Sequence, residues 1–200
     1  MWRMLLVVLM FGLAGCGDPP SKRFLNTEMT GADFGRELNG FRDHHGNPRT
    51  LADFRGKAVV LFFGYTSCPD VCPTTLVRLA EVMAKLGDAA GRVQVLMLTV
   101  DPQRDTPERL AAYMTGFNSS FIGLTGDQAA TEAAVKEFKA FFSRGKDVHQ
   151  HGKETPADVI DHTAGAYVLD SAGKIRLYLK DDASVESVAS DLKRLLNERY

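Results

Sequence analysis

Two cysteines stand out as the side chains best suited to chemistry. Cys68 and Cys72 are separated by three residues in the run GYTSCPDVCPTTL. Thiolates are soft donors that select Cu(I), zinc or iron–sulfur clusters, and a pair of thiols can also cycle between dithiol and disulfide. A structural zinc ion takes four ligands and an iron–sulfur cluster usually four cysteines, so two cysteines alone favour copper among the metals. The spacing by itself does not separate metal binding from redox exchange.

The elements on either side place the cysteines at the edge of a sheet. The apolar run at 58–63 predicts a strand buried on both faces, which Gly64 ends. A helix is expected to begin at Pro73, because proline suits the first helical position and apolar residues follow at helical spacing. Ligands gather at the carboxyl ends of strands in α/β sheets, and the positive end of a helix stabilises a thiolate. We therefore expect a lowered thiol pKa, more so at Cys72 because it adjoins Pro73.

The remainder of the chain alternates between strand and helix patterns. Thr106 is expected to cap a helix that has Pro107 in its first position. Polar, irregular sequence at 143–161 predicts an inserted surface excursion. Strands are expected at 93–100, 121–124, 164–169 and 174–180, and helices at 106–117, from 125 or 127 to 142, and at 185–196. This order predicts an α/β domain with a central mixed sheet, mostly parallel with an antiparallel part, flanked by helices.

The first residues have the layout of an export signal. Arg3 is the only charge in residues 1–15, an apolar core follows it, and small residues lead into Cys16. The sequence Leu-Ala-Gly-Cys resembles a bacterial lipobox, whose cysteine is lipidated and becomes the mature N-terminus; an uncleaved signal anchor is the alternative. Residues 16–30 are expected to form a tether, and residues 31–200 a folded domain. This arrangement predicts a periplasmic domain on the outer face of a bacterial inner membrane.

Cysteine count and composition narrow the class of protein. If Cys16 carries lipid, Cys68 and Cys72 are the only cysteines that remain. A disulfide closing so short a loop would restrain little of the unfolded chain, so the pair is expected to serve chemistry. Of 200 residues, 44% are hydrophobic and 24% charged, as in a globular protein, and the net charge of −1 predicts no nucleic-acid partner.

Copper that visits the cupric state also wants a nitrogen donor, and the chain has five histidines. His44 and His45 fall in a turn-rich segment and are expected to be solvated. His149 and His151 lie in the polar excursion, on the same side of an extended chain, where exposed histidines without a metal are the commoner case. His162 stands at the entrance of a strand near the sheet edge, where a structural role is the commoner one.

Three segments together resemble the signature sequences of the Sco/SenC family. They are GYTSCPDVCPTTL, TVDPQRDTPE at 99–108 and DHTAGAYVLD at 161–170, in that order. The resemblance implies a thioredoxin-like fold and delivery of copper to the CuA site in the copper-bearing subunit of cytochrome c oxidase during its assembly. It also implies that Cys68, Cys72 and His162 are the copper ligands.

The resemblance assigns supporting roles and reveals small departures. Asp70 is implied to lie close to the metal, while Asp101 and Asp105 are expected to shape a turn and a capped helix rather than bind metal. Ser67 stands where many relatives carry histidine, and Thr163 where many carry serine. Neither departure removes a ligand. Many relatives use a membrane-spanning helix where this chain is expected to use lipid, so membrane attachment is kept by another means.

Three functions fit these residues. A copper chaperone would hold Cu(I) on the two cysteines, or Cu(II) with His162 completing the site, and another periplasmic copper chaperone is a candidate partner. A thiol–disulfide oxidoreductase would use the same pair to reduce the recipient's cysteines, although thioredoxins have two residues between theirs. A peroxidase-like role has the least support, because no peroxide-activating constellation is visible. We expect copper delivery, with thiol reduction as the alternative.

Overall fold

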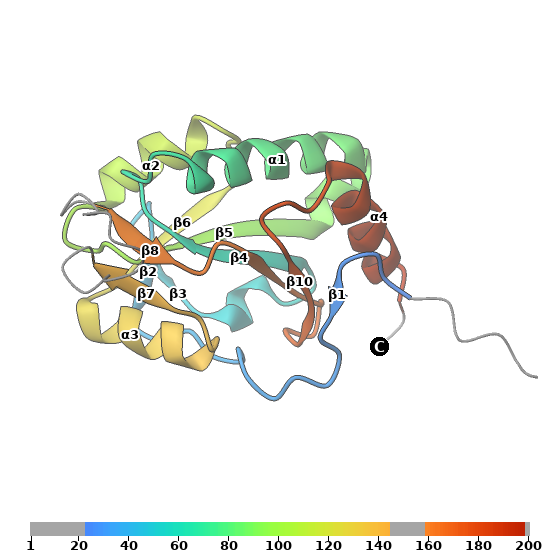
Figure 1. The fold of residues 1–200 in the computed structure, drawn as a ribbon, viewed down its shortest axis with the longest axis horizontal. Helices are drawn as coiled ribbons and strands as arrows, with labels where there is room; N and C mark the ends of the chain where they lie inside the picture. The colour runs from blue at the N-terminus through green and yellow to red at the C-terminus, as the bar shows by residue number, and fades with distance from the viewer. Residues whose placement is uncertain (1–22, 145–158, 199–200) are drawn as a thin grey trace, which may run out of the picture.

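The computed structural model describes residues 23–144 and 159–198. Within them, eight strands form one sheet in the order β1-β10-β9-β4-β5-β6-β2-β3, with helices on both faces (Figure 1). The strands are β1 (Thr27–Glu28), β2 (Phe41–Asp43), β3 (Pro48–Arg49), β4 (Ala58–Gly64), β5 (Val93–Thr99), β6 (Ile122–Thr125), β9 (Ala166–Leu169) and β10 (Ile175–Leu179). The helices are α1 (Val71–Leu86), α2 (Pro107–Thr115), α3 (Gln128–Glu137) and α4 (Val185–Leu196), with short 3-10 turns η1 (Leu51–Phe54) and η2 (Gly87–Arg92).

Only the centre of this sheet is parallel. β4 pairs in parallel with β5, and β5 with β6, whereas the other pairings among the described strands are antiparallel. The α/β class and the mixed central sheet are confirmed, but the expectation of a mostly parallel sheet is wrong. The β2–β3 and β9–β10 pairs flank the parallel strands, and strands joined by short turns pair antiparallel.

Strand β4 leads to the cysteines and is buried along its whole length. Its side chains alternate between two layers, as the pleat of a strand requires. Val60 and Phe62 pack with residues of α1, α2 and α4, while Val59 and Leu61 pack in the cluster that contains residues of α3. Burial on both faces explains the continuous apolar sequence and brings the chain to the cysteines at the sheet edge.

The helix starts follow the sequence signals, with one exception that matters for the site. Thr106 caps α2 as predicted, accepting a hydrogen bond from the backbone N–H of Arg109 at 3.3 Å. Helix α1 begins at Val71 rather than at Pro73, so Cys72 belongs to its first turn. The two cysteines therefore lie on opposite sides of the helix start.

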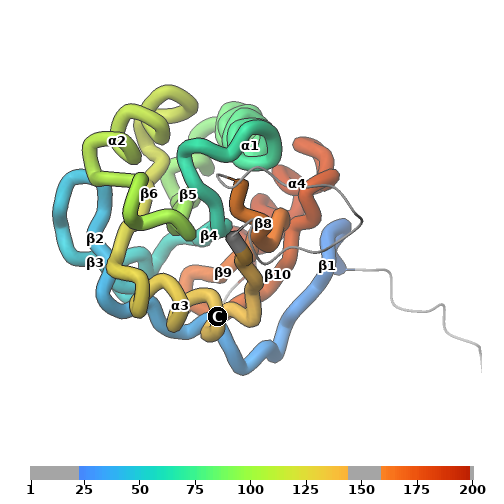
Figure 2. Tube along the Cα trace, turned by 60° about the vertical axis from the view of Figure 1, so that its left-hand side comes forward, coloured from blue at the N-terminus to red at the C-terminus, as the bar shows by residue number. Residues whose placement is uncertain are grey.

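A separate two-stranded ribbon stands apart from the main sheet. It consists of β7 (Phe142–Arg144) and β8 (Ile160–His162), which pair antiparallel with Phe142 opposite His162. Figure 2 shows β8 close to the end of β4 and the start of α1. The ribbon is formed by the two ends of the predicted excursion, and residues 145–158, with His149 and His151, lie outside the described residues.

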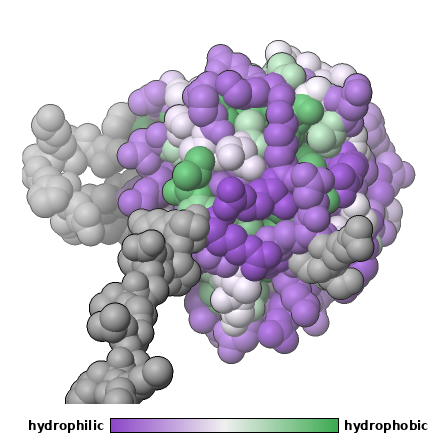
Figure 3. All heavy atoms as spheres, turned by 90° about the vertical axis from the view of Figure 1, so that its right-hand side faces the viewer, coloured by the Kyte–Doolittle hydropathy of each residue, from purple (hydrophilic) through white to green (hydrophobic). Residues whose placement is uncertain are grey.

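The segment before residue 31 joins the fold earlier than the expected tether boundary. Phe24 is buried, β1 pairs with β10 at the sheet edge, and the Asp191 carboxylate of α4 accepts hydrogen bonds from the backbone N–H groups of Leu25 and Asn26. This end of the domain is largely covered by polar side chains, with small apolar patches between them (Figure 3). Among the described helices, none has the length and apolar character needed to cross a bilayer.

Candidate metal centre

The cysteine loop connects the end of β4 to the start of α1, as the sequence predicted. Cys68 is half-buried, Cys72 is 1% exposed, and both thiols are free. The backbone N–H of Cys72 points at the sulfur of Cys68, with a distance of 3.5 Å between nitrogen and Sγ. The sulfur that lies over the amino end of α1 is therefore that of Cys68.

The two thiols differ strongly in acidity. A hydrogen bond from the Cys72 thiol is the main cause that lowers the pKa of Cys68 to about 3, with His162 adding to it against the opposing effect of burial. The same hydrogen bond, followed by burial, raises the pKa of Cys72 well above its usual range. The prediction that Cys72 would be the more acidic thiol is wrong, because its thiol donates to the Cys68 sulfur and is buried. Cys68 is the thiolate, and Cys72 donates to it.

His162 joins the cysteines although about ninety residues separate them in the chain. Its Nε2 lies 3.5 Å from the Cys72 Sγ, and the nearest ligand atoms of the three residues all lie within 4.8 Å of one another. Its Nδ1 lies 3.0 Å from the backbone carbonyl oxygen of Thr163. An imidazole that donates from Nδ1 keeps the lone pair of Nε2 free for a metal. Among the described residues, this is the only group of three or more such side chains with metal-binding geometry.

Asp105 supports the cysteine loop without touching the ligands. Its buried carboxylate accepts hydrogen bonds from the backbone N–H of Thr66 at 3.0 Å, from the Thr66 hydroxyl at 2.6 Å and from the Thr99 hydroxyl at 2.5 Å. Asp101 is also buried and forms an ion pair with Arg104. Neither aspartate belongs to the donor group, in line with the sequence analysis. No sequence pattern indicates, however, that Asp105 holds Thr66, the residue two places before Cys68.

Two further residues, Arg109 and Gly64, shape the loop. The Arg109 guanidinium donates to the Ser67 hydroxyl at 2.7 Å, so the residue just before Cys68 is held by α2. Gly64 makes room for the buried sulfur, because a Cβ placed there would lie 2.8 Å from the Cys72 Sγ. From the sequence, Gly64 is predicted only to end a strand.

An open groove of about 360 Å³ borders the donor group. Asp70, expected near the metal, is exposed at the rim of this groove and receives a weak hydrogen bond of 3.4 Å from Thr74. Its carboxylate is not part of the three-residue donor group. The groove is lined by Tyr65, Cys68, Pro69, Asp70, Val71, Val159, Ile160, Asp161, His162 and Ala164.

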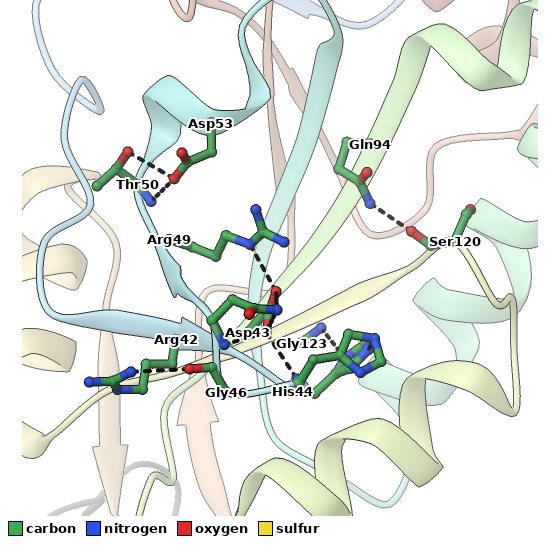
Figure 4. Close-up of polar contacts among 12 residues, drawn as sticks. Arg42, Asp43, His44, Gly46, Arg49, Thr50, Asp53, Gln94, Ser120 and Gly123 are labelled. Atoms are coloured by element: carbon green, nitrogen blue, oxygen red, sulfur yellow. Dashed lines mark hydrogen bonds and ion pairs between the residues drawn. The ribbon is translucent and has the colours of Figure 1, made fainter.

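The histidine pair at 44 and 45 lies elsewhere and has a different role. His44 was expected to be solvated but is buried, and its Nδ1 accepts the backbone N–H of Gly123 at 3.1 Å (Figure 4). Its Nε2 lies 3.1 Å from the Nε2 of His45. Because Nδ1 accepts a hydrogen bond, neutral His44 carries its proton on Nε2, which leaves no lone pair there for a metal. His44 ties β2 to β6 as a structural residue.

Comparison with known proteins identifies the family. The SCO1/SenC family model matches residues 28–197. The chain belongs to the SCO1/SenC family. Among its relatives, the mitochondrial Protein SCO2 homolog of Bos taurus is 36% identical over 155 residues, which are 76% of this chain and 56% of that protein. The SCO2-like protein of Rickettsia felis is 32% identical over 153 residues, 76% of this chain and 72% of the relative. The chain thus spans little more than half the length of the mammalian relative.

Solved Sco structures have the same fold as this SCO1/SenC chain. Bradyrhizobium japonicum ScoI with copper bound is 33% identical, with a TM-score of 0.69 over 81% of this chain and 99% of that one. Yeast Sco1 with copper bound is 27% identical, with a TM-score of 0.73 over 84% of this chain and 91% of that one. The fold is thioredoxin-like, as the family resemblance implied.

Proposed function

We propose that this protein is a copper chaperone that binds copper through Cys68, Cys72 and His162 and delivers it to the CuA site of cytochrome c oxidase during assembly. The observation that carries the proposal is the convergence of the three donor atoms within 4.8 Å in a chain of the SCO1/SenC family. Solved relatives from Bradyrhizobium japonicum and yeast have copper bound. The recipient is the copper-bearing subunit of the oxidase.

The donor set suits copper better than other soft metals. Two cysteine sulfurs satisfy Cu(I) at low coordination number, and an imidazole nitrogen adds the donor that Cu(II) prefers. Structural zinc would need a fourth ligand, and no fourth histidine, cysteine or carboxylate joins the group among the described residues. Copper held by these three residues would keep an open coordination position, on the side where no residue of the group lies, for a ligand from the recipient.

The groove gives a recipient access to that free side. Cys68 lines the groove, whereas Cys72 is buried behind it. A recipient thiolate that enters along the groove meets the metal on the Cys68 side, so ligand exchange begins there. Because thiolates and not thiols ligate copper, the proton held by Cys72 leaves when the metal binds and returns after transfer.

Membrane attachment is the second part of the proposal. Residues 1–15 serve as a signal peptide, Cys16 carries lipid, and the polar stretch after it tethers the domain on the periplasmic side of the inner membrane. The support is the order of charge, apolar core and small residues before Cys16. In cells supplied with labelled palmitate, the wild-type chain should take up the label and a Cys16→Ser variant should not, and a wild-type chain without label would contradict lipidation. A second periplasmic chaperone is a candidate source of the copper.

The asymmetry of the thiols favours thiol–disulfide exchange as a second candidate function. The Cys68 thiolate would attack a disulfide of the recipient, forming a mixed disulfide and releasing one recipient thiolate. Cys72 would then lose its proton and attack Cys68, which releases the second recipient thiolate and leaves Cys68 and Cys72 oxidised. Reduction of the recipient by two electrons therefore equals oxidation of this pair.

One set of variants tests copper binding and separates it from exchange. Copper stoichiometry and sulfur-to-Cu(II) charge-transfer bands are measured for wild type, Cys68→Ser, Cys72→Ser and His162→Ala, with His45→Ala as a histidine control away from the site. Each cysteine variant should lose the bands, and His162→Ala should weaken copper binding while it keeps dithiol exchange. Copper retention by His162→Ala equal to that of the control would refute the role of His162, and equal loss of both activities would refute their separation.

A further inference from the structure

The position of His162 depends on how the β7–β8 ribbon is attached. β8 pairs with β7 and is not a strand of the eight-stranded sheet that carries the cysteine loop. His162 is the last residue of β8, whereas Cys68 and Cys72 follow the end of β4. The third donor therefore lies on a strand outside the sheet that leads to the two sulfurs, and a contact must hold that strand in place relative to the cysteine loop.

Tyr65 contacts both parts. It is fully buried and directly follows β4, and its backbone carbonyl accepts the N–H of Cys68 at 3.2 Å. Its hydroxyl accepts the backbone N–H of Ile160 at 3.1 Å, two residues before His162. Its ring lies edge-on to the His162 imidazole, with 5.8 Å between centroids and 85° between planes. One residue thus joins the cysteine loop through its backbone to the histidine strand through its side chain.

We propose that Tyr65 is a positioning residue for His162, whose hydroxyl fixes β8 so that the Nε2 of His162 faces the cysteine sulfurs. This inference rests on the proposed copper function, because it assigns to Tyr65 the placement of one of the copper ligands. Side chains two apart on a strand point to the same side, so a displacement of Ile160 is carried directly to His162.

The hydroxyl matters apart from the ring. Ile160 is buried, and without the hydroxyl its N–H would lose its acceptor. A buried donor without an acceptor is unfavourable, so β8 would shift until water or another oxygen reaches this group. The aromatic ring would still fill its place in the core. Because metal ligands must be held within about half an ångström of productive geometry, such a shift is enough to weaken the third ligand.

The test is Tyr65→Phe in the full chain, with Tyr113→Phe as the matched control. Tyr113 also has a buried hydroxyl, and burial, followed by the nearby Cys72 and Cys68, raises its pKa, but that hydroxyl has no hydrogen-bond partner among the described residues. Cu(II) affinity, the charge-transfer spectrum and nitrogen hyperfine coupling report on the histidine ligand. Dithiol exchange with a small disulfide reports on the cysteines alone.

Tyr65→Phe should weaken Cu(II) binding by about 10-fold or more and reduce the nitrogen coupling, as loss of a group that orients a metal ligand usually does. Dithiol exchange should stay within about twofold of wild type, because the backbone contact to Cys68 is kept. Tyr113→Phe should match wild type in all readouts. A wild-type affinity and spectrum for Tyr65→Phe, or an equal loss in Tyr113→Phe, would overturn the inference.

A double variant ties the effect to His162 and guards against a general loss of stability. If Tyr65 acts through His162, then adding Tyr65→Phe to His162→Ala should cause no further loss of copper affinity. Additive losses would mean that Tyr65 acts by another route and would refute its positioning role. Failure of the copper function itself has a different signature, namely a wild-type protein that retains no more copper than the Cys68→Ser and Cys72→Ser variants.

Discussion

Gly64→Ala should displace the sulfur of Cys72, a proposed copper ligand, by adding one methyl group beside it. The new Cβ would lie 2.8 Å from the Cys72 Sγ, 3.1 Å from the Phe62 ring and 3.4 Å from the Met97 sulfur. Ordinary contact begins at 3.4 Å, so the Cys72 sulfur must retreat by about 0.6 Å. Metal–ligand distances tolerate deviations of about 0.2 Å, so a displacement of this size does not fit the site.

Two effects of this substitution differ in magnitude and in readout. Overpacking of a buried position costs about 1–3 kcal/mol of unfolding free energy, and each kcal/mol lowers Tm by roughly 2–4 °C in a domain of this size. The displaced sulfur should in addition weaken Cu(I) binding by about 10–100-fold, the usual effect of disturbing the surroundings of a metal ligand. Calorimetric melting of the metal-free protein measures the first effect, and competition with a chromophoric Cu(I) chelator measures the second.

Gly123→Ala is the matched control for overpacking alone. Gly123 lies on β6 of the same sheet as Gly64, and its added Cβ would lie 3.1–3.2 Å from Leu110 and Met114 of α2, away from the sulfurs. It should lower Tm by a comparable amount and leave Cu(I) affinity unchanged. If Gly64→Ala lowers Tm but retains the affinity of wild type, the space above Gly64 does not set the position of the Cys72 sulfur, and the reasoning is wrong.

Three other expectations follow from the thiols, the loop and the buried histidine. Iodoacetamide should label Cys68 before Cys72, and mass spectrometry can follow the labelling. The rate should stay constant from pH 8 down to about pH 5, because the lowered pKa keeps Cys68 a thiolate. A tenfold fall in rate per pH unit would contradict this. Asp105→Asn places an amide donor among three donors, so denaturant unfolding should register a loss of about 1–3 kcal/mol. Burial, followed by the nearby His45, lowers the pKa of His44 in the folded protein. As the pH falls below about 6.5, the His44 imidazole therefore binds a proton more readily in the unfolded chain, and the free energy of unfolding decreases. His44→Asn, whose side-chain oxygen still accepts from Gly123, should flatten the difference in unfolding free energy between pH 7.5 and 5.5, and an unchanged slope would exclude His44 as its source.

The sequence predicted what depends on local pattern. The apolar run of β4, the cap at Thr106 and the helix after the cysteines each follow from side chains close in the chain. These placed Cys68 and Cys72 at the carboxyl end of a buried strand. His162 lies on a separate ribbon, and no local pattern links it to the sulfurs; only the resemblance of three segments to one family did so.

Features that depend on tertiary contacts could not be predicted from the sequence. The acidity of Cys68 over Cys72 follows from the hydrogen bond between the two thiols and from the burial of Cys72. The start of α1 at Val71 also places the backbone N–H of Cys72 at the Cys68 sulfur. Burial of His44 depends on the pairing of β2 with β6, strands far apart in the chain. Donors and acceptors that meet across such pairings have no signature in the spacing of residues.

If the domain is anchored by lipid as proposed, the distance between its two ends sets the height above the bilayer at which copper would be transferred. The described chain starts beside α4, at the right-hand end of Figure 1, while β8 and the cysteine loop lie at the opposite end. The seven residues of β4 alone span about 23 Å along this direction. With lipid on Cys16, the tether would join the domain at the end that lies beside α4, and the proposed copper site would lie at the end far from the membrane. To reach a recipient site close to the bilayer, the domain would have to tilt toward the membrane. The length of the polar stretch before residue 23 would therefore determine which heights of the recipient site can be reached.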